Sequence, residues 1–137
     1  MTPKTIDQLL DEARAQLERL SPSEAAAAVK QGALLVDIRA ESQRERDGIV
    51  PEAVFIPRNV LEWRADPNSE WRDPELSDPE RQVILMCNEG YQSSLAAATL
   101  KRLGLTATDL VGGFQAWREE GLEVQPLHPA ERSDRSV

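Results

Sequence analysis

The feature that most constrains this chain is an apolar run that ends in its single cysteine and leads directly into a helical pattern. Residues 83–86 are consecutive apolar side chains, and such a short run predicts a strand buried on both faces of a parallel sheet. Cys87 follows at the carboxyl end of that strand. After a short turn, residues 93–103 begin with two serines and carry leucine and alanine at helical spacing. The sequence therefore predicts a strand, a tight turn and a helix arranged around one sulfur atom.

The turn of residues 88–92 is too short to extend far from the two elements that it joins. A turn of this kind directs backbone N–H groups inward, and the first turn of the helix adds further free donors, so an anion can be held there. Helix N-termini lower the pKa of cysteine thiols from about 8.5 to roughly 3.5–7.5, which favours the nucleophilic thiolate at Cys87. The alternative is that Cys87 is a small buried apolar residue at the end of a core strand. The strand and turn do not separate the two readings.

Length and composition narrow the classes of protein to consider. The chain has 137 residues, which suits one domain with a single core, and its net charge of -8 argues against nucleic acid or an anionic membrane as the main partner. One cysteine excludes an internal disulfide, and the lack of a signal peptide or a long apolar run indicates the cytoplasm. No pair of histidines or thiols is available for a metal, and no cofactor is predicted. Any sulfur or redox cycle must then finish on an external thiol or acceptor.

The N-terminal part of the chain is helical in pattern. Residues 5–20 carry apolar side chains at helical intervals, and we expect this amphipathic helix to cover an edge of the core or to serve as a docking surface. Residues 21–24, Ser-Pro-Ser-Glu, form a capping box with proline at the first helical position, so a second helix begins there and ends before Gly32.

The remaining pattern alternates between strands and helices. Asp37 and Arg39 follow an apolar run, and we expect them to tie the strand end to neighbouring loops, while Trp63 is expected to be a core aromatic residue. The predicted elements are a strand over 33–38, a helix over 40–47, a strand over 53–56, a short helix around 60–63, an irregular loop over 66–80, a strand over 106–111, a Gly112-Gly113 turn and a helix over 114–120.

This alternation predicts an α/β fold. Right-handed crossovers require a mostly parallel sheet, here of about five strands with helices on both faces and an extra N-terminal helix. Ligands bind beyond the carboxyl ends of such strands, where Cys87, Arg39, Arg58 and the Gly112-Gly113 turn fall. We divide the chain into an N-terminal helix over 1–19, a core domain over 20–124 and a flexible tail over 125–137.

Several segments of the core domain resemble the single-domain rhodanese family. LLVDIR at residues 34–39 resembles the first signature strand of that family, and GIVPEA at 48–53 resembles its Gly-His-Ile-Pro-Gly-Ala segment. VGGFQAWR at 111–118 resembles the C-terminal signature, and Cys87 with Gly90 resembles the active-site loop. The resemblance covers about residues 20–124.

The resemblance implies a sulfurtransferase or persulfide carrier. Its thiolate takes sulfane sulfur from a donor such as thiosulfate or a protein persulfide and passes it to cyanide or a biological thiol. The site so implied has Cys87 as the covalent nucleophile and the backbone of the following loop as the anion-binding group. Its substrate-binding residues are Asn88, Glu89, Gly90, Tyr91, Gln92 and Ser93. The partner is a small sulfur compound or a protein that carries a persulfide or thiol.

Two positions depart from the family pattern. Gln92 stands where many single-domain relatives have an arginine, and Ile49 stands where the family has a histidine. Gln92 offers neutral hydrogen bonds in place of a guanidinium, and Glu89 makes the mouth more acidic, so a small anionic donor should bind less well. We expect Arg58, on the same rim, to replace part of the missing charge.

Two other function classes stay open at this point. A rhodanese-like module can bind a partner or sense oxidants through Cys87 without turnover. A cysteine phosphatase needs an arginine six residues after its cysteine, where this chain has Ser93. The phosphatase is therefore the least favoured of these alternatives.

Overall fold

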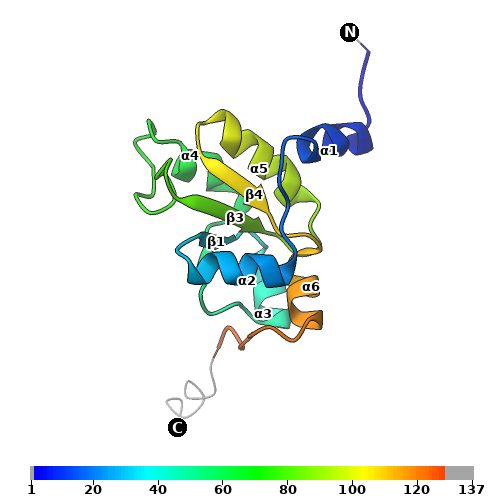
Figure 1. The fold of residues 1–137 in the computed structure, drawn as a ribbon, viewed down its shortest axis with the longest axis vertical. Helices are drawn as coiled ribbons and strands as arrows, with labels where there is room; N and C mark the ends of the chain where they lie inside the picture. Colours follow the sequence, from blue (N-terminus) through cyan, green and yellow to red (C-terminus); the bar gives the residue numbers. More distant parts are fainter. Residues whose placement is uncertain (1, 129–137) are drawn as a thin grey trace.

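A parallel sheet forms the centre of the molecule, which the computed structural model describes over residues 2–128 (Figure 1). Its four strands lie in the order β2-β1-β3-β4, which confirms the predicted parallel architecture with four strands in place of about five. Leu20 adds an isolated parallel bridge to Leu110 beside the last strand. The strands are β1 (Leu34–Asp37), β2 (Val54–Phe55), β3 (Gln82–Met86) and β4 (Thr106–Asp109).

The central position of β3 decides where Cys87 lies. β3 pairs with β1 on one side and with β4 on the other, and its residues Val83–Met86 are fully buried, as the apolar run predicts. In the register of the sheet, Asp37 is opposite Met86 and Asp109 is opposite Leu85. Cys87 therefore leaves the sheet between the ends of two neighbouring strands that each finish in an aspartate.

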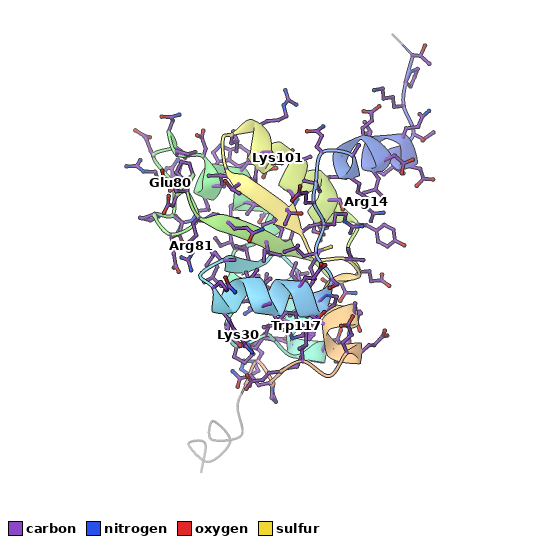
Figure 2. The ribbon with its side chains drawn as sticks, in the orientation of Figure 1. Arg14, Lys30, Glu80, Arg81, Lys101 and Trp117 are labelled. Atoms are coloured by element: carbon purple, nitrogen blue, oxygen red, sulfur yellow. The ribbon has the colours of Figure 1, made fainter. Side chains whose placement is uncertain are left out.

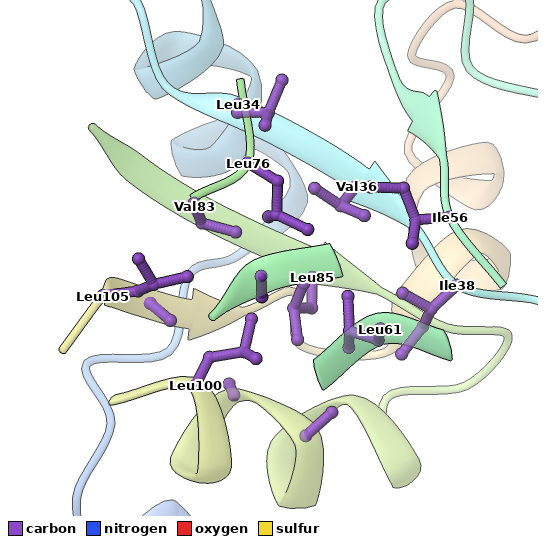
Figure 3. Packing of buried hydrophobic residues seen from close by; sticks show 14 of the residues in the cluster. Leu34, Val36, Ile38, Ile56, Leu61, Leu76, Val83, Leu85, Leu100 and Leu105 are labelled. Atoms are coloured by element: carbon purple, nitrogen blue, oxygen red, sulfur yellow. The ribbon is translucent and has the colours of Figure 1, made fainter. Parts of the chain in front are cut away.

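Helices cover both faces of the sheet, as the sequence predicts (Figure 1). One apolar cluster lies between the sheet and the helices α4 and α5, and Figure 3 shows Leu61 and Leu100 packed there against Val36 and Leu85. A second cluster on the opposite face includes Phe114 and Trp117. The helices are α1 (Ile6–Arg14), α2 (Pro22–Lys30), α3 (Glu41–Asp47), α4 (Leu61–Ala65), α5 (Gln92–Arg102) and α6 (Gly113–Glu119), with a short 3-10 turn, η1 (Arg58–Val60), before α4.

The N-terminal helix is shorter than predicted. It packs on α5 and ends at Arg14, so the expected helix over residues 15–20 is wrong. The chain instead runs beside β4, where the N–H of Leu20 donates to Asp109 O at 3.1 Å and that of Val111 donates to Leu20 O at 2.8 Å. These bonds satisfy backbone groups at the open edge of the sheet. The stabilisation gained from this pairing outweighs the helix propensity of residues 15–20.

The predicted start of α2 is confirmed, and one predicted core residue is wrong. Ser21 and Glu24 form the expected reciprocal capping box. Trp63 is 58% exposed, because α4 is short and buries Leu61 and Ala65, which lie four positions apart on one face.

The predicted tail begins with an ordered contact. Gln125 exchanges backbone hydrogen bonds of 2.8 and 2.9 Å with Ile49. Residues 129–137, the rest of the tail predicted to be flexible, lie outside the described residues. Between residues 2 and 128, no helix is both long enough and apolar enough to cross a membrane.

Candidate active site

The loop between β3 and α5 surrounds the sulfur of Cys87. The helix begins at Gln92, one residue earlier than predicted, and Tyr91 at its N-cap makes no capping bond with its side chain. The N–H groups of Gln92 and Ser93 are therefore not taken up by a cap, whereas that of Ser94 donates to Tyr91 O at 3.1 Å. They lie in the same short segment as the sulfur.

Cys87 is nearly inaccessible, yet its sulfur makes polar contacts. The residue is 2% exposed and belongs to the apolar cluster beneath α5. Its Sγ lies 3.2 Å from the Oγ of Ser93 and accepts a hydrogen bond of 3.2 Å from the N–H of Gly90. Cys87 thus packs as a core residue does, and its sulfur also contacts hydrogen-bonding groups.

The loop also carries backbone donors that no protein group uses. The N–H of Gly90 donates to the sulfur. Within residues 2–128, five other loop amides donate to no protein acceptor, namely those of Asn88, Glu89, Tyr91, Gln92 and Ser93. Backbone N–H groups gathered in one turn attract anions, so these free donors are the groups on which the predicted anion binding would depend.

Glycines allow the loop to pack against the start of α6. Gly90 has φ of 87°, and a Cβ there would lie 2.7 Å from the amide nitrogen of Gly112. A side chain at Gly113 would overlap the carbonyl oxygen of Cys87. That carbonyl accepts the N–H of Phe114 at 2.9 Å, so the Gly112-Gly113 turn is fixed directly behind the sulfur.

Asp109 links this loop to the N-terminal segment. It is fully buried, and its Oδ2 accepts hydrogen bonds of 2.7 Å from the hydroxyls of both Ser93 and Ser94. Arg19 donates to its two carboxylate oxygens at 2.8 and 3.2 Å. Sequence reasoning missed Asp109 and Arg19 as site residues, because 90 positions separate them and no spacing pattern joins them.

The hydroxyl of Ser93 can serve the sulfur in two ways. It has one hydrogen, which it donates to Asp109, so it accepts a hydrogen bond from the Cys87 thiol. Rotation of the hydroxyl would direct that hydrogen to an anionic sulfur instead. Asp109 would then keep its bonds from Ser94 and Arg19, and no buried carboxylate would lose all of its partners. The arrangement can therefore accommodate both the thiol and an anionic sulfur.

Other predicted site residues have partners elsewhere. Arg58 donates to both carboxylate oxygens of Glu62, at 3.0 and 2.9 Å. The side chains of Glu89, Tyr91 and Gln92 are exposed at the surface of the loop. Arg39 is buried and donates to both carboxylate oxygens of Asp37. This pair ties together the end of β1, as expected from the place of both residues at the strand end.

Asn88 is held from the side of α3 and α6. Its side-chain oxygen accepts from Gln115 Nε2 at 3.0 Å, and the same nitrogen donates to Asp47 at 3.0 Å. The adjacent Arg46 guanidinium lowers the pKa of Asp47 to about 2, so this carboxylate stays charged in mild acid. Asn88 is thereby fixed at the start of the loop.

Among residues 2–128, no group of three or more histidine, cysteine, aspartate or glutamate side chains could hold a metal ion. A surface cavity of about 490 Å³ lies between residues 15–18 and β4, and its lining includes neither Cys87 nor the loop that follows it.

Sequence comparison identifies relatives of known class. Residues 21–120 match the rhodanese-like domain family. The chain is 30% identical over 104 residues to the thiosulfate sulfurtransferase GlpE of Pseudomonas savastanoi pv. phaseolicola, which covers 75% of this chain and 89% of that enzyme. It is also 30% identical over 111 residues to the adenylyltransferase and sulfurtransferase uba4 of Aspergillus terreus, but covers only 22% of that longer protein.

Structural comparison agrees with the sequence match. A protein of unknown function from Rhodopseudomonas palustris, described as a possible tyrosine phosphatase, has a TM-score of 0.82 and 33% identity, over 91% of this chain and 97% of the other. A thiosulfate sulfurtransferase from Pseudomonas aeruginosa has a TM-score of 0.65 at 22% identity, over 80% of this chain and 19% of the other, and shows the fold alone. The matched residues and the GlpE relative show that this chain belongs to the rhodanese-like domain family.

Proposed function

We propose that this protein is a sulfurtransferase or persulfide carrier in which Cys87 holds the transferred sulfur. The observation that carries the proposal is the environment of Sγ, which contacts the N–H of Gly90 and the hydroxyl of Ser93 in a loop with further free amides. An inert core cysteine needs none of these donors. A persulfide anion does, because burial of a charge without hydrogen bonds is costly.

The transfer consists of two displacements at sulfur. The thiolate of Cys87 attacks the outer sulfur of a donor, the Sγ–S bond forms, and the donor bond breaks with its electron pair leaving on sulfite or on the donor thiolate. An acceptor thiolate or cyanide then attacks the outer sulfur of the persulfide. The Sγ–S bond breaks and the Cys87 thiolate is restored. No electrons enter or leave the cycle.

The charges on the exposed surface of the loop around Cys87 affect which sulfur donor can bind. Gln92 and Glu89 are exposed on the loop, so the mouth contributes a neutral amide and a carboxylate where many relatives contribute a guanidinium. Small dianions such as thiosulfate would be held mainly by backbone amides. A protein persulfide, which brings further contacts of its own, is a suitable donor, and the thiols of a reducing cytoplasm are suitable acceptors.

Mass spectrometry of the intact protein tests the proposal. After incubation with thiosulfate, polysulfide or a persulfide-bearing protein, the chain should gain one sulfur on Cys87 that a thiol reductant removes. Cys87→Ser is the control and should gain none. If no donor loads the folded protein, the carrier proposal is wrong.

A second candidate is a non-catalytic binding or redox-sensing module. Its non-catalytic binding form is favoured by the 2% exposure of Cys87, which restricts access to the sulfur, and by Gln92 in the arginine position. With no second cysteine, an oxidised sulfur must be resolved by an external thiol. Formation of a mixed disulfide after mild peroxide and glutathione treatment, without any sulfur loading, would support this candidate.

Phosphatase chemistry has less support. The Rhodopseudomonas protein is described as a possible tyrosine phosphatase, but this chain has Ser93 six residues after Cys87 and no arginine between Cys87 and Leu100. The loop therefore supplies amides without the guanidinium that would clamp a phosphoryl group.

A further inference from the structure

The N-terminal segment, which precedes the matched family domain at residues 21–120, reaches the active-site loop with two arginines. Arg14, the last residue of α1, donates to the carbonyl oxygen of Gly90 at 2.7 Å and to the Oγ of Ser94 at 3.1 Å. Arg19 donates to the same Gly90 oxygen at 3.0 Å. Figure 2 shows Arg14 below α1, on the side of the molecule where that helix meets α5.

These contacts determine the orientation of one peptide group in the loop. In a planar trans peptide the C=O and the following N–H point in opposite directions. Because two guanidinium groups hold the Gly90 oxygen, the N–H of Tyr91 is directed away from them, and it donates to no protein group in residues 2–128. The arginines thus fix one of the free donors of the loop. Arg14 also lies 5.5 Å from the ring centre of Tyr91.

Arg19 has a second effect, on charge. Asp109 is fully buried and is one hydroxyl group away from the sulfur, since Ser93 contacts both. An unpaired carboxylate at this distance would repel an anionic sulfur, and burial would strengthen the repulsion. Arg19 contacts both oxygens of Asp109 and neutralises this charge.

We propose that Arg14 and Arg19 are positioning residues of the sulfur site, supplying from outside the family domain the positive charge that Gln92 does not provide. They act through the Gly90 carbonyl and Asp109 rather than by contact with a substrate. The proposal rests on the proposed function in one respect, that an anionic form of Cys87 is the species to be stabilised.

Alkylation of Cys87 in the intact protein tests this without any sulfur transfer. Rate constants are measured with iodoacetate, which is an anion, and with iodoacetamide, which is neutral, and their ratio reports the charge near the sulfur. Arg19→Gln should lower the iodoacetate to iodoacetamide ratio by about fivefold, and Arg14→Gln by about twofold because Arg14 reaches Asp109 through Ser94 and not directly. Arg81→Gln is the matched control, since Arg81 pairs with Glu75 and lies across the molecule from Arg14 (Figure 2).

A double variant distinguishes charge from structure. Arg19→Gln combined with Asp109→Asn removes both members of the pair, so the ratio should return to within about twofold of the natural protein. A purely structural role predicts that the second substitution adds damage. If Arg19→Gln alone does not fold, Arg14→Gln and the double variant still decide the question.

The outcome is separate from that of the proposed function. Ratios in the Arg14 and Arg19 variants equal to the Arg81→Gln value would overturn the positioning role, whether or not Cys87 accepts sulfur. Conversely, a lowered ratio in a protein that takes up no sulfur would retain the positioning role and reject the carrier function.

Discussion

The strands on either side of β3 both end in a buried aspartate, but the two aspartates have different partners. Asp37, at the end of β1, is bound by Arg39 and Arg44, which are its near neighbours in sequence. Asp109, at the end of β4, is bound by Arg19, 90 positions away. Both carboxylates are almost completely inaccessible, and both would be costly to leave unpaired.

The difference lies in what each pair contacts next. Arg39 continues to the carbonyl of Gly48 and lies 3.8 Å from the ring centre of Phe114, so this pair closes the end of β1. Asp109 continues to the hydroxyls of Ser93 and Ser94, so its pair reaches the loop around Cys87. Two carboxylate–guanidinium pairs of the same kind therefore flank β3, one at the closed end of β1 and one in contact with the loop around Cys87.

The largest expected effect, on the free energy of unfolding, comes from replacing the carboxylate of each pair in turn. Asp37→Asn leaves a buried guanidinium without a counterion, and we expect it to lower the free energy of unfolding by about 3–5 kcal/mol. Asp109→Asn should cost less, about 1–3 kcal/mol, because the side chain of Arg19 is 17% exposed and can be hydrated. Urea unfolding measures both.

For the reactivity of Cys87, the order of the two variants should be reversed, with the larger effect in Asp109→Asn. Under conditions where both are folded, Asp109→Asn should increase the rate of alkylation by iodoacetate, since the carboxylate charge near the sulfur is lost and Ser93 is released to donate to it. Asp37→Asn should leave that rate unchanged. If Asp37→Asn alters the rate as much as Asp109→Asn does, the division between a structural side and a site side is wrong.

A cation placed in the loop itself tests whether positive charge beside Cys87 limits sulfur transfer. Gln92→Arg adds a guanidinium at the exposed start of α5, and one charge-assisted hydrogen bond of roughly 1.5–3 kcal/mol corresponds to about tenfold or more in thiosulfate turnover. Thiocyanate formation from thiosulfate and cyanide measures the gain, with Cys87→Ser as the blank. An unchanged rate in a folded variant would mean that charge at the mouth does not limit turnover.

Arg58 offers a smaller test on the Asp37 side of the sheet. We propose that it supplies part of the missing charge, although it is paired with Glu62. Because a partly exposed charge is screened, Arg58→Ala should lower thiocyanate formation by only about two- to threefold, and Glu62→Gln should raise it by a similar factor. If neither variant changes the rate of thiocyanate formation, Arg58 is not a substitute cation, and a protein-bound persulfide becomes the favoured donor.

The smallest effect concerns acid. The pKa of Asp47 falls from 3.8 to about 2 in the folded protein, mainly because of its hydrogen bond with Arg46. A lowered pKa contributes stability above the unfolded value that is lost as pH falls through the folded value, here between about pH 4 and pH 2. Asp47→Asn should therefore flatten the decline of the urea midpoint over that range. An equally steep decline in the variant would assign the acid sensitivity to other carboxylates.

Much of the site could be predicted because its parts are local in sequence. The apolar run ending in Cys87, the turn after it and the glycines at 90, 112 and 113 each specify backbone geometry within a few residues, and the structure confirms that geometry. The parallel sheet also followed from the alternation of short apolar runs with helical patterns. Local propensity failed at residues 15–20 and at Trp63, where edge pairing and the shortness of α4 decided the outcome.

A parallel α/β fold with one cysteine before an amide-rich turn, at the end of the central strand, can thus be predicted from the residues alone. The charges that surround that turn are set by long-range packing. Arg14 and Arg19 meet Gly90 across 76 and 71 positions, and Arg19 meets Asp109 across 90. Contacts over such separations have no periodicity, because they depend on how the N-terminal segment packs against α5 and the edge of β4.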